Sequence, residues 1–303
     1  MERGADLLLI TFPIAGIKTY LFIPPAVAFG ISFFTSMAGI SGAFLLLPFQ
    51  MSVLGFTTTS VTSTNFLFNV TGTPGGIYCY MKECRFAWPV ALTIVAGIIP
   101  GVLIGYYIRI RLLPDPKSFK LFVGIVLLCV ALKLIRDAWA RKISDRDNSC
   151  SLSDRVDNLS MGLKRTRFDF KGATHSFSTG SLLLLAFTVG IIGGTYGIGG
   201  GSIIAPFLIT LFKLPVYTIA GAVLLGTFAS SAAGVAFYSL IPIAGAVAPP
   251  EWMLGILFGA GGLLGTYCGA KMQKHISEKW IKLILGIIVL IIASRYILRF
   301  FNG

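Results

Sequence analysis

The stretch Gly197-Ile-Gly-Gly-Gly-Ser-Ile-Ile-Ala-Pro206-Phe207 interrupts an otherwise apolar region of the chain. Residues 178–196 before it form a long apolar segment, whereas the apolar segment at residues 202–212 is short. A straight helix needs about 20 apolar residues to span a bilayer, so the second segment is too short. Because consecutive glycines let the backbone turn sharply, the stretch predicts a broken helix followed by a short one.

A second copy of this pattern occurs earlier in the chain. Gly39-Ile-Ser-Gly-Ala-Phe-Leu-Leu-Leu-Pro48-Phe49 matches the first stretch at a constant offset of 158 residues, and the short apolar segment 43–54 again follows the glycines. Further pairs occur in the same order, first at this offset and then with small shifts: Gly76 with Gly234, Tyr80 with Tyr238, Gly105 with Gly265, Tyr107 with Tyr267, Lys120 with Lys282 and Gly124 with Gly286. A fixed period indicates internal duplication, so we expect two homologous helical repeats.

The composition predicts the environment of these repeats. The chain is 55% hydrophobic and only 12% charged, with a mean hydropathy of +0.83, whereas soluble domains carry about a quarter charged residues. In lipid each spanning segment satisfies its own backbone groups, which favours helices. We therefore expect an all-α polytopic membrane protein. Its candidate spans are residues 21–38, 60–81, 86–108, 119–134, 178–196, 219–241, 252–270 and 280–298.

A hydrophilic segment separates the two repeats. Residues 141–171 are charged and serine-rich, which is typical of a solvated linker with little regular structure. The predicted division is a first transmembrane repeat at residues 1–140, a basic linker at 141–177 and a second repeat at 178–303.

The membrane topology of the repeats has two solutions. If the short helix re-enters from one face, each repeat has four crossings and the repeats are parallel; if it crosses, each has five and they are inverted. Basic residues flank both ends of the spans and nearly cancel as a positive-inside signal, so the charges leave the orientation open.

Several classes of partner are disfavoured by the charged residues and cysteines. The net charge is +13, but Lys and Arg between apolar segments are expected in a membrane protein, so we expect no nucleic acid partner. The five cysteines show no CxxC or CxxH spacing, so no metal or other cofactor is expected. No Asp, Glu, Lys or Arg lies in the middle of a span, which argues against a cation carrier or a proton relay.

The glycine breaks are the candidate substrate site. Interrupted helices in corresponding positions of two repeats are the best sequence indicator of a transporter's binding site, and the free N–H groups at a helix N-terminus bind anions. Nearby hydroxyl and amide side chains add hydrogen-bonding groups. The candidate residues are Gly39, Ser41, Gly42, Thr64, Asn65, Asn69, Gly199, Gly200, Gly201, Ser202 and Thr227.

Two simpler roles stay open for these residues. Glycines at such spacings also let helices pack closely, and Ser or Thr side chains commonly bond to their own helix backbone. Asn65 and Asn69, which lie one helical turn apart, are harder to explain in that way.

The sequence resembles the TauE/SafE sulfite exporter family. The resemblance rests on Gly197-x-Gly-Gly-Gly-x-x-x-x-Pro206, its weaker first-half copy, Thr64-Asn65, and the Gly76…Tyr80 and Gly234…Tyr238 pairs. It implies multi-pass transport of sulfite, organosulfonates or related anions across the cytoplasmic membrane, often outward. Two departures concern the substrate: the first copy lacks the full triple glycine, and Ala222-Val223 replaces the family's usual Thr-Ser pair.

Two other functions are compatible with parts of the sequence. A passive anion channel would use the same groups. Gly39-Ile-Ser41-Gly42 also matches the GxSG of rhomboid intramembrane serine proteases, but a serine nucleophile needs a base within hydrogen-bond reach. The two histidines, His175 and His275, lie outside the spans, so we expect no enzyme.

Overall fold

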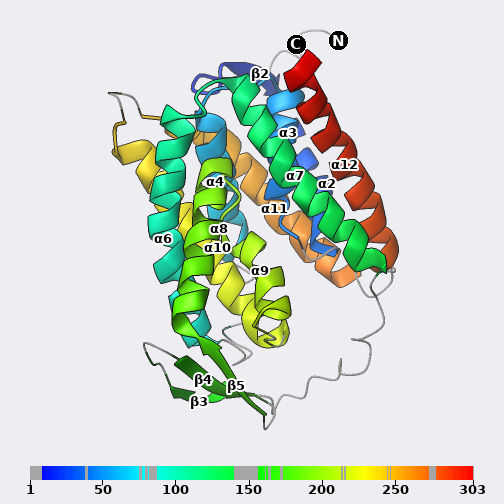
Figure 1. Cartoon of the computed structure of the whole chain (residues 1–303). Helices are drawn as coiled ribbons and strands as arrows, with labels where there is room; N and C mark the ends of the chain where they lie inside the picture. The colour runs from blue at the N-terminus through cyan, green and yellow to red at the C-terminus, as the bar shows by residue number, and fades with distance from the viewer. Residues whose placement is uncertain are drawn as a thin grey trace.

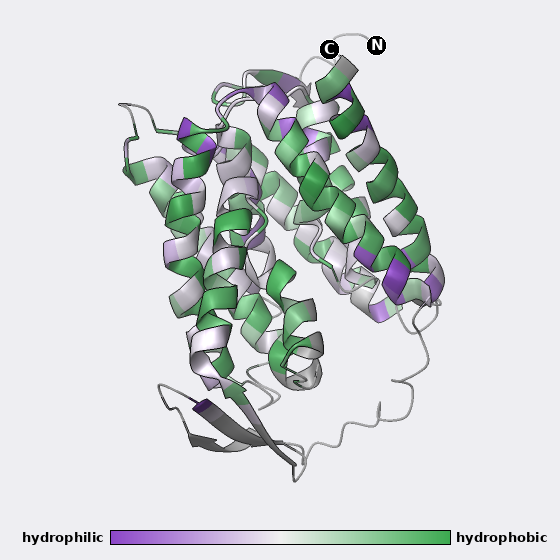
Figure 2. Ribbon diagram, in the orientation of Figure 1, coloured by the Kyte–Doolittle hydropathy of each residue, from purple (hydrophilic) through white to green (hydrophobic). Residues whose placement is uncertain are grey.

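The computed structural model describes residues 9–37, 40–74, 77–78, 81, 87–139, 156–160, 162, 165–170, 173–212, 214, 216–243, 245, 247–272 and 278–302. Within these ranges six helices are long and apolar enough to cross a membrane. Hydrophobic residues extend along the outer helices, and hydrophilic ones gather at their ends (Figure 2). The predicted all-α polytopic membrane protein is therefore confirmed.

Among the described elements, the long and short helices follow one another in a similar order in both halves of the chain (Figure 1). The short helices α3 and α9 each have ten residues, and they begin 158 positions apart, the offset of the sequence copies. The helices of the first half are α2 (Ile23–Met37), α3 (Ala43–Ser52), α4 (Ser60–Gly72), α6 (Trp88–Arg111) and α7 (Pro116–Trp139). Those of the second half are α8 (Thr179–Tyr196), α9 (Gly201–Thr210), α10 (Val216–Leu240), α11 (Trp252–Met272) and α12 (Glu278–Asn302).

Glycine contacts fix the relative directions of the long helices. Along α6, Gly101 lies against Phe187 and Gly105 against Ile191, so α6 and α8 are parallel. Gly265 and Gly269 of α11 lie in the same order against Phe29 and Phe33, so α11 and α2 are also parallel.

The outer helices α7 and α12 are antiparallel. Gly124 of α7 faces Tyr296, whereas Gly286 of α12 faces Leu134 and Ile135. Helix α7 follows α6 after a short turn and runs back, and α12 follows α11 and runs back along α7 (Figure 1). Helices at corresponding positions of the two halves thus run in opposite directions, as in inverted-topology repeats.

Each short helix turns back toward the end of the molecule from which the preceding helix came. Gly42, before α3, lies beside Ser32 in the middle of α2, and Ser52 at the end of α3 bonds to the Tyr296 hydroxyl at 2.6 Å. In the second half the rings of Phe177 and Phe212, which flank α8 and α9, are 6.3 Å apart.

The halves are therefore inverted although their short helices re-enter. The sequence analysis had paired re-entry with parallel repeats and crossing with inverted repeats, so neither of its two topologies matches. Both of those schemes counted the helix before the break as a full crossing. In the first half that count fails, because helix α2 has only 15 residues, about 22 Å at 1.5 Å per residue, which is less than the roughly 30 Å of a hydrocarbon core.

Two small sheets lie outside the helical part. Strands β1 (Leu9–Phe12) and β2 (Ile17–Tyr20) form an antiparallel hairpin before α2, which the sequence analysis did not predict. Strands β3 (Val156–Ser160), β4 (Arg165–Phe170) and β5 (Ala173–Ser178) form an antiparallel sheet before α8. The expectation of little regular structure was therefore wrong for this part of the linker, because backbone pairing between neighbouring strands does not depend on large apolar side chains.

The buried core has two parts, and each draws on both halves of the chain. One contains apolar side chains of the hairpin, α2, α3 and α7 together with α11 and α12. The other contains side chains of α6 together with α8, α9 and α10. Tyr196 and Ile198, at the second glycine break, belong to the first core, so this break lies where the two parts meet.

Candidate functional site

Left-handed glycines make the second break. Gly197 ends α8 with φ +91°, and Gly199 follows with φ +78°. Side chains at both positions are excluded by sterics as well as by conformation. A Cβ atom at Gly197 would lie 2.5 Å from the carbonyl oxygen of Thr62, and one at Gly199 would lie 2.8 Å from the Ser231 hydroxyl.

One amide side chain joins the two breaks. The Asn65 Nδ2 donates to the carbonyl oxygens of Ala43, the first residue of α3, and of Gly197, at 3.1 Å each. Both oxygens lie more than 20 residues from Asn65 in sequence, and one belongs to each half of the chain. Gln50 donates to the Asn65 Oδ1 at 3.4 Å, so Asn65 is held on both sides.

Asn69 makes a second link one turn further along α4. Its Nδ2 donates to the carbonyl oxygen of Ile198 at 2.6 Å, and its Oδ1 accepts from the Ser41 hydroxyl at 3.5 Å. The Tyr196 hydroxyl donates to the carbonyl oxygen of Phe44 at 2.9 Å. The two breaks, about 158 residues apart, are therefore direct neighbours inside the protein.

The N-termini of the short helices have few polar groups of their own. Gly42 and Gly200 occupy the N-cap positions of α3 and α9, and neither helix has a side-chain hydrogen bond from its N-cap residue. Nearby hydroxyls accept from the first N–H groups instead: Ser41 from Ala43 at 3.3 Å, and Ser230 from Gly200 at 3.2 Å. Each terminus thus offers N–H groups and partial positive charge that neutral hydroxyls cover.

Close packing accounts for some of the predicted site residues. A Cβ atom at Gly201 would lie 2.1 Å from the Val223 carbonyl oxygen and 2.3 Å from the Thr227 hydroxyl, so this glycine lets α9 pack on α10. The Thr227 hydroxyl donates to the Val223 carbonyl oxygen at 3.0 Å. Gly201 and Thr227 therefore have the simpler roles of helix packing and of bonding to the helix backbone.

The remaining predicted residues lie in different surroundings. The Thr64 hydroxyl donates to the Ser60 carbonyl oxygen at 2.8 Å and accepts from the Glu251 N–H at 2.9 Å, so it faces α11. Ser202 lies in the first turn of α9, and its side chain is not among those described. Gly39 lies outside the described residues.

Arg109 is a buried residue that the sequence analysis left just outside the candidate span at residues 86–108. It lies in the last turn of α6 and has no solvent exposure. Its Nε donates to the Thr62 hydroxyl at 3.2 Å, its Nη1 donates to the Leu113 carbonyl oxygen, and its guanidinium lies 3.7 Å from the centre of the Phe119 ring. The signal in the sequence was its position four residues after Gly105 and eight after Gly101, which places Arg109 on the packed face of the helix.

No group of three or more His, Cys, Asp or Glu side chains able to hold a metal ion occurs within the described ranges. The polar groups at the breaks are amides, hydroxyls and backbone N–H groups, which suit an anion better than a metal ion.

Comparison with known proteins identifies the family. The sequence model of the family described as "Sulfite exporter TauE/SafE" matches residues 25–296. The chain is 28% identical over 220 residues to "Probable membrane transporter protein YunE" of Bacillus subtilis (strain 168), a match that covers 72% of this chain and 73% of that protein. No solved structure shows a significant match. The chain therefore belongs to the TauE/SafE family of multi-pass membrane transporters.

Proposed function

We propose that this protein is a secondary transporter that exports a sulfur-containing oxyanion, sulfite or an organosulfonate, across the cytoplasmic membrane, and that it has no enzymatic activity. The observation that carries the proposal is the Asn65 amide, which bonds to the backbone of both glycine breaks. Two helix N-termini held side by side offer an oxyanion N–H donors from both halves of the chain.

The N-termini of the short helices support an anion rather than a cation as substrate. The first N–H groups of α3 and α9 already bond to the neutral hydroxyls of Ser41 and Ser230. An oxyanion that replaces a hydroxyl forms charge-assisted hydrogen bonds, which are roughly twice as strong as neutral ones. We expect the second half to supply more of these contacts, because the run Gly199-Gly-Gly-Ser202 has no equally glycine-rich equivalent at Ser41-Gly-Ala-Phe44.

Burial of the breaks supports a carrier over a passive channel. Gly42, Asn65 and Asn69 are buried, as are Gly199 and Gly200, so a substrate reaches them only after the surrounding helices move. Because the second break lies where the two cores meet, movement of one core against the other would open the breaks to one side at a time. A carrier of this kind shows saturation and exchange, whereas a channel does not.

The membrane potential suffices to drive export. With the cytoplasm negative, each unit of negative charge that leaves gains about 2.3 kcal/mol per 100 mV. This corresponds to about a fifty-fold concentration ratio, so export needs no coupled ion.

Flux from proteoliposomes tests the proposal. Vesicles that contain the purified protein and labelled sulfite are given a potential with a potassium gradient and valinomycin. We expect saturable efflux that is faster when the interior is negative and that exchanges with external sulfite. Efflux that is indifferent to the potential would contradict electrogenic export, and linear, exchange-free efflux would favour the channel.

Two leucine substitutions separate the site from general damage. At Gly200 a Cβ atom would lie 3.0 Å from the Ile98 side chain and 3.4 Å from Val189, so the Gly200→Leu side chain has no room at the N-terminus of α9. We expect it to abolish transport. The control is Gly180→Leu, because no atom lies within 4 Å of a Cβ at Gly180. Full transport by the Gly200→Leu variant would contradict the binding site at α9.

A further inference from the structure

We propose that Arg109 forms an anion-binding station next to the second glycine break, where the unpaired Nη2 of its guanidinium donates a hydrogen bond to an oxygen of the transported oxyanion. This inference rests on the proposed function and adds a charged residue to its path. It is carried by the hydrogen bonds of Arg109, by its burial and by its position relative to Gly197.

The guanidinium has an unused nitrogen in a buried place. Two of its three nitrogens have acceptors, Thr62 and the Leu113 carbonyl oxygen, and Nη2 has no hydrogen-bond partner. An arginine carries five N–H donors and no acceptor, so the two N–H groups on Nη2 are available to a ligand. Buried side-chain polar groups are normally satisfied, and an open one marks a place for a missing partner.

The charge is also uncompensated in its immediate surroundings. The three described contacts of the guanidinium are a hydroxyl, a carbonyl oxygen and the face of Phe119, all of which are neutral. Buried charges are normally paired, and charged residues within membrane-spanning segments are costly and commonly functional. A bound oxyanion would supply the negative charge that these neighbours lack.

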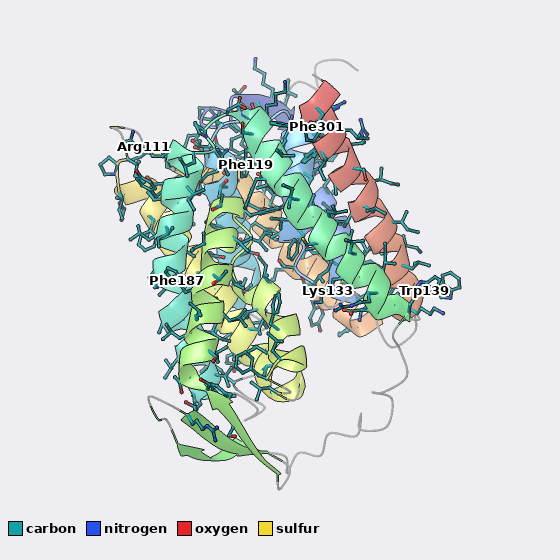
Figure 3. The ribbon with its side chains drawn as sticks, viewed as in Figure 1. Arg111, Phe119, Lys133, Trp139, Phe187 and Phe301 are labelled. Atoms are coloured by element: carbon teal, nitrogen blue, oxygen red, sulfur yellow. The ribbon has the colours of Figure 1, made fainter. Side chains whose placement is uncertain are left out.

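Thr62 connects Arg109 to the glycine break. Its hydroxyl accepts from Arg109, and its backbone carbonyl lies against Gly197, where a Cβ atom would come within 2.5 Å. One residue thus separates the guanidinium from the start of the segment that leads into α9. Arg109 also lies in the last turn of α6, two residues before the exposed Arg111, which Figure 3 shows at that end of the helix. Arg109 is thus placed between that end of the molecule and the break.

The geometry of a guanidinium suits an oxyanion better than a halide. Its planar N–H groups match the spacing of two oxygens on one sulfur, carbon or phosphorus atom. The fixed hydrogen bonds of Nε and Nη1 hold the plane still and leave Nη2 to face the ligand. The ligand class is therefore a small oxyanion such as sulfite or a sulfonate.

Arg109→Gln tests this station, with Arg111→Gln as its matched control. Glutamine keeps an amide that can donate to Thr62 or Leu113 but has no charge, and Arg111 lies two residues away on the exposed face of α6. Thermal unfolding of each purified protein is followed against sulfite, sulfate and methanesulfonate at constant ionic strength, with sulfite samples kept anaerobic. We expect at least one anion to stabilise the wild-type protein and the Arg111→Gln variant. In Arg109→Gln the concentration of that anion at half-saturation should be at least about tenfold higher.

The outcomes separate this inference from the proposed function. Equal half-saturation in Arg109→Gln and wild type, or no stabilisation of the wild type by any of the three anions, overturns the station. Sulfite efflux with an unchanged KM in Arg109→Gln overturns it too, and leaves the transporter in place. If the wild type moves no sulfite but Arg109 is needed for another of the anions, the station stands and the substrate assignment fails. If Arg109→Gln does not fold, Arg109→Lys decides, because lysine has no planar fork and must raise half-saturation.

Discussion

At the scale of single residues, the asparagines of α4 have a different role from the one predicted from the sequence. The Nδ2 of Asn65 donates to two backbone carbonyls, and that of Asn69 donates to a third. These bonds position the backbone of the breaks, and they occupy amide groups that the sequence analysis had assigned to the substrate. In this conformation Nη2 of Arg109 has no hydrogen-bond partner, and the N–H groups of Ala43 and Gly200 bond to neutral hydroxyls that an anion would replace.

The glycines of the breaks allow a prediction at the same scale. Gly197→Ala places a side chain at φ +91° and 2.5 Å from the Thr62 carbonyl oxygen. Gly245→Ala has similar strain, at φ +78°, but nothing within 4 Å, and Gly180→Ala has open space and no positive φ. Strain at a single residue costs about 1–3 kcal/mol. In thermal unfolding we expect Gly197→Ala to be the least stable, Gly245→Ala intermediate and Gly180→Ala close to wild type.

The order of these three variants distinguishes the two causes. If Gly197→Ala and Gly245→Ala lose the same stability, the contact with Thr62 has no effect and only the backbone conformation matters.

At the scale of elements, a buried carboxylate attaches the N-terminal hairpin to the helices. The Glu251 Oε2 accepts from the N–H groups of Ile14 at 2.7 Å and Ala15 at 3.1 Å, in the turn between β1 and β2. The Glu251 N–H in turn donates to Thr64 on α4. Glu251, the residue before α11, thus links the hairpin to α4, the helix that carries Asn65.

Glu251→Ala should release this hairpin. Hydrogen bonds to a charged group contribute about 1.5–3 kcal/mol each, and the substitution removes two. We expect faster limited proteolysis within residues 9–20. The control is Asp115→Ala, which removes an exposed carboxylate that accepts from the Ser118 N–H at 2.9 Å before α7. Unchanged cleavage within the hairpin in Glu251→Ala would show that the apolar contacts of Phe12 and Ile17 suffice to hold it.

At the scale of the whole molecule, both halves of the chain contribute helices to each of the two cores. Helix α6 packs on α8, α11 packs on α2, and α7 packs on α12, so the most extensive helix contacts join opposite halves. Small residues at these contacts let the backbones approach closely: Gly101 meets Gly190, and Gly105 meets Gly194. Neither half has a complete core alone.

A split chain tests this arrangement. When residues 1–145 and 146–303 are produced as separate polypeptides in one cell, we expect them to assemble and to co-purify through a tag on either one. Each half produced alone should be degraded or aggregated, because the partner surfaces of its helices are missing. A half that purifies alone as a monodisperse, cooperatively unfolding protein would contradict this expectation.

Much of the fold was predictable because its signals are local. Apolar length indicated the approximate positions of the ten helices described above. The glycine runs indicated the two breaks, since a broken helix needs consecutive residues that tolerate unusual backbone angles. The family could be recognised for the same reason, because its motif is a contiguous stretch around Gly197. The hairpin at residues 9–20 escaped prediction because its strands are only four residues long.

What the sequence by itself determined is therefore a membrane protein with two similar series of helices, each containing a break. Only the tertiary structure decided which way the helices run, that the breaks touch through Asn65, and that Arg109 is buried while Arg111 is exposed. The physical reason is that lipid and protein interior are equally apolar, so hydropathy does not distinguish a lipid-facing residue from a packed one. Contacts between residues far apart in the sequence, such as Asn65 with Gly197 and Arg109 with Thr62 across helices, appear only when the chain is folded.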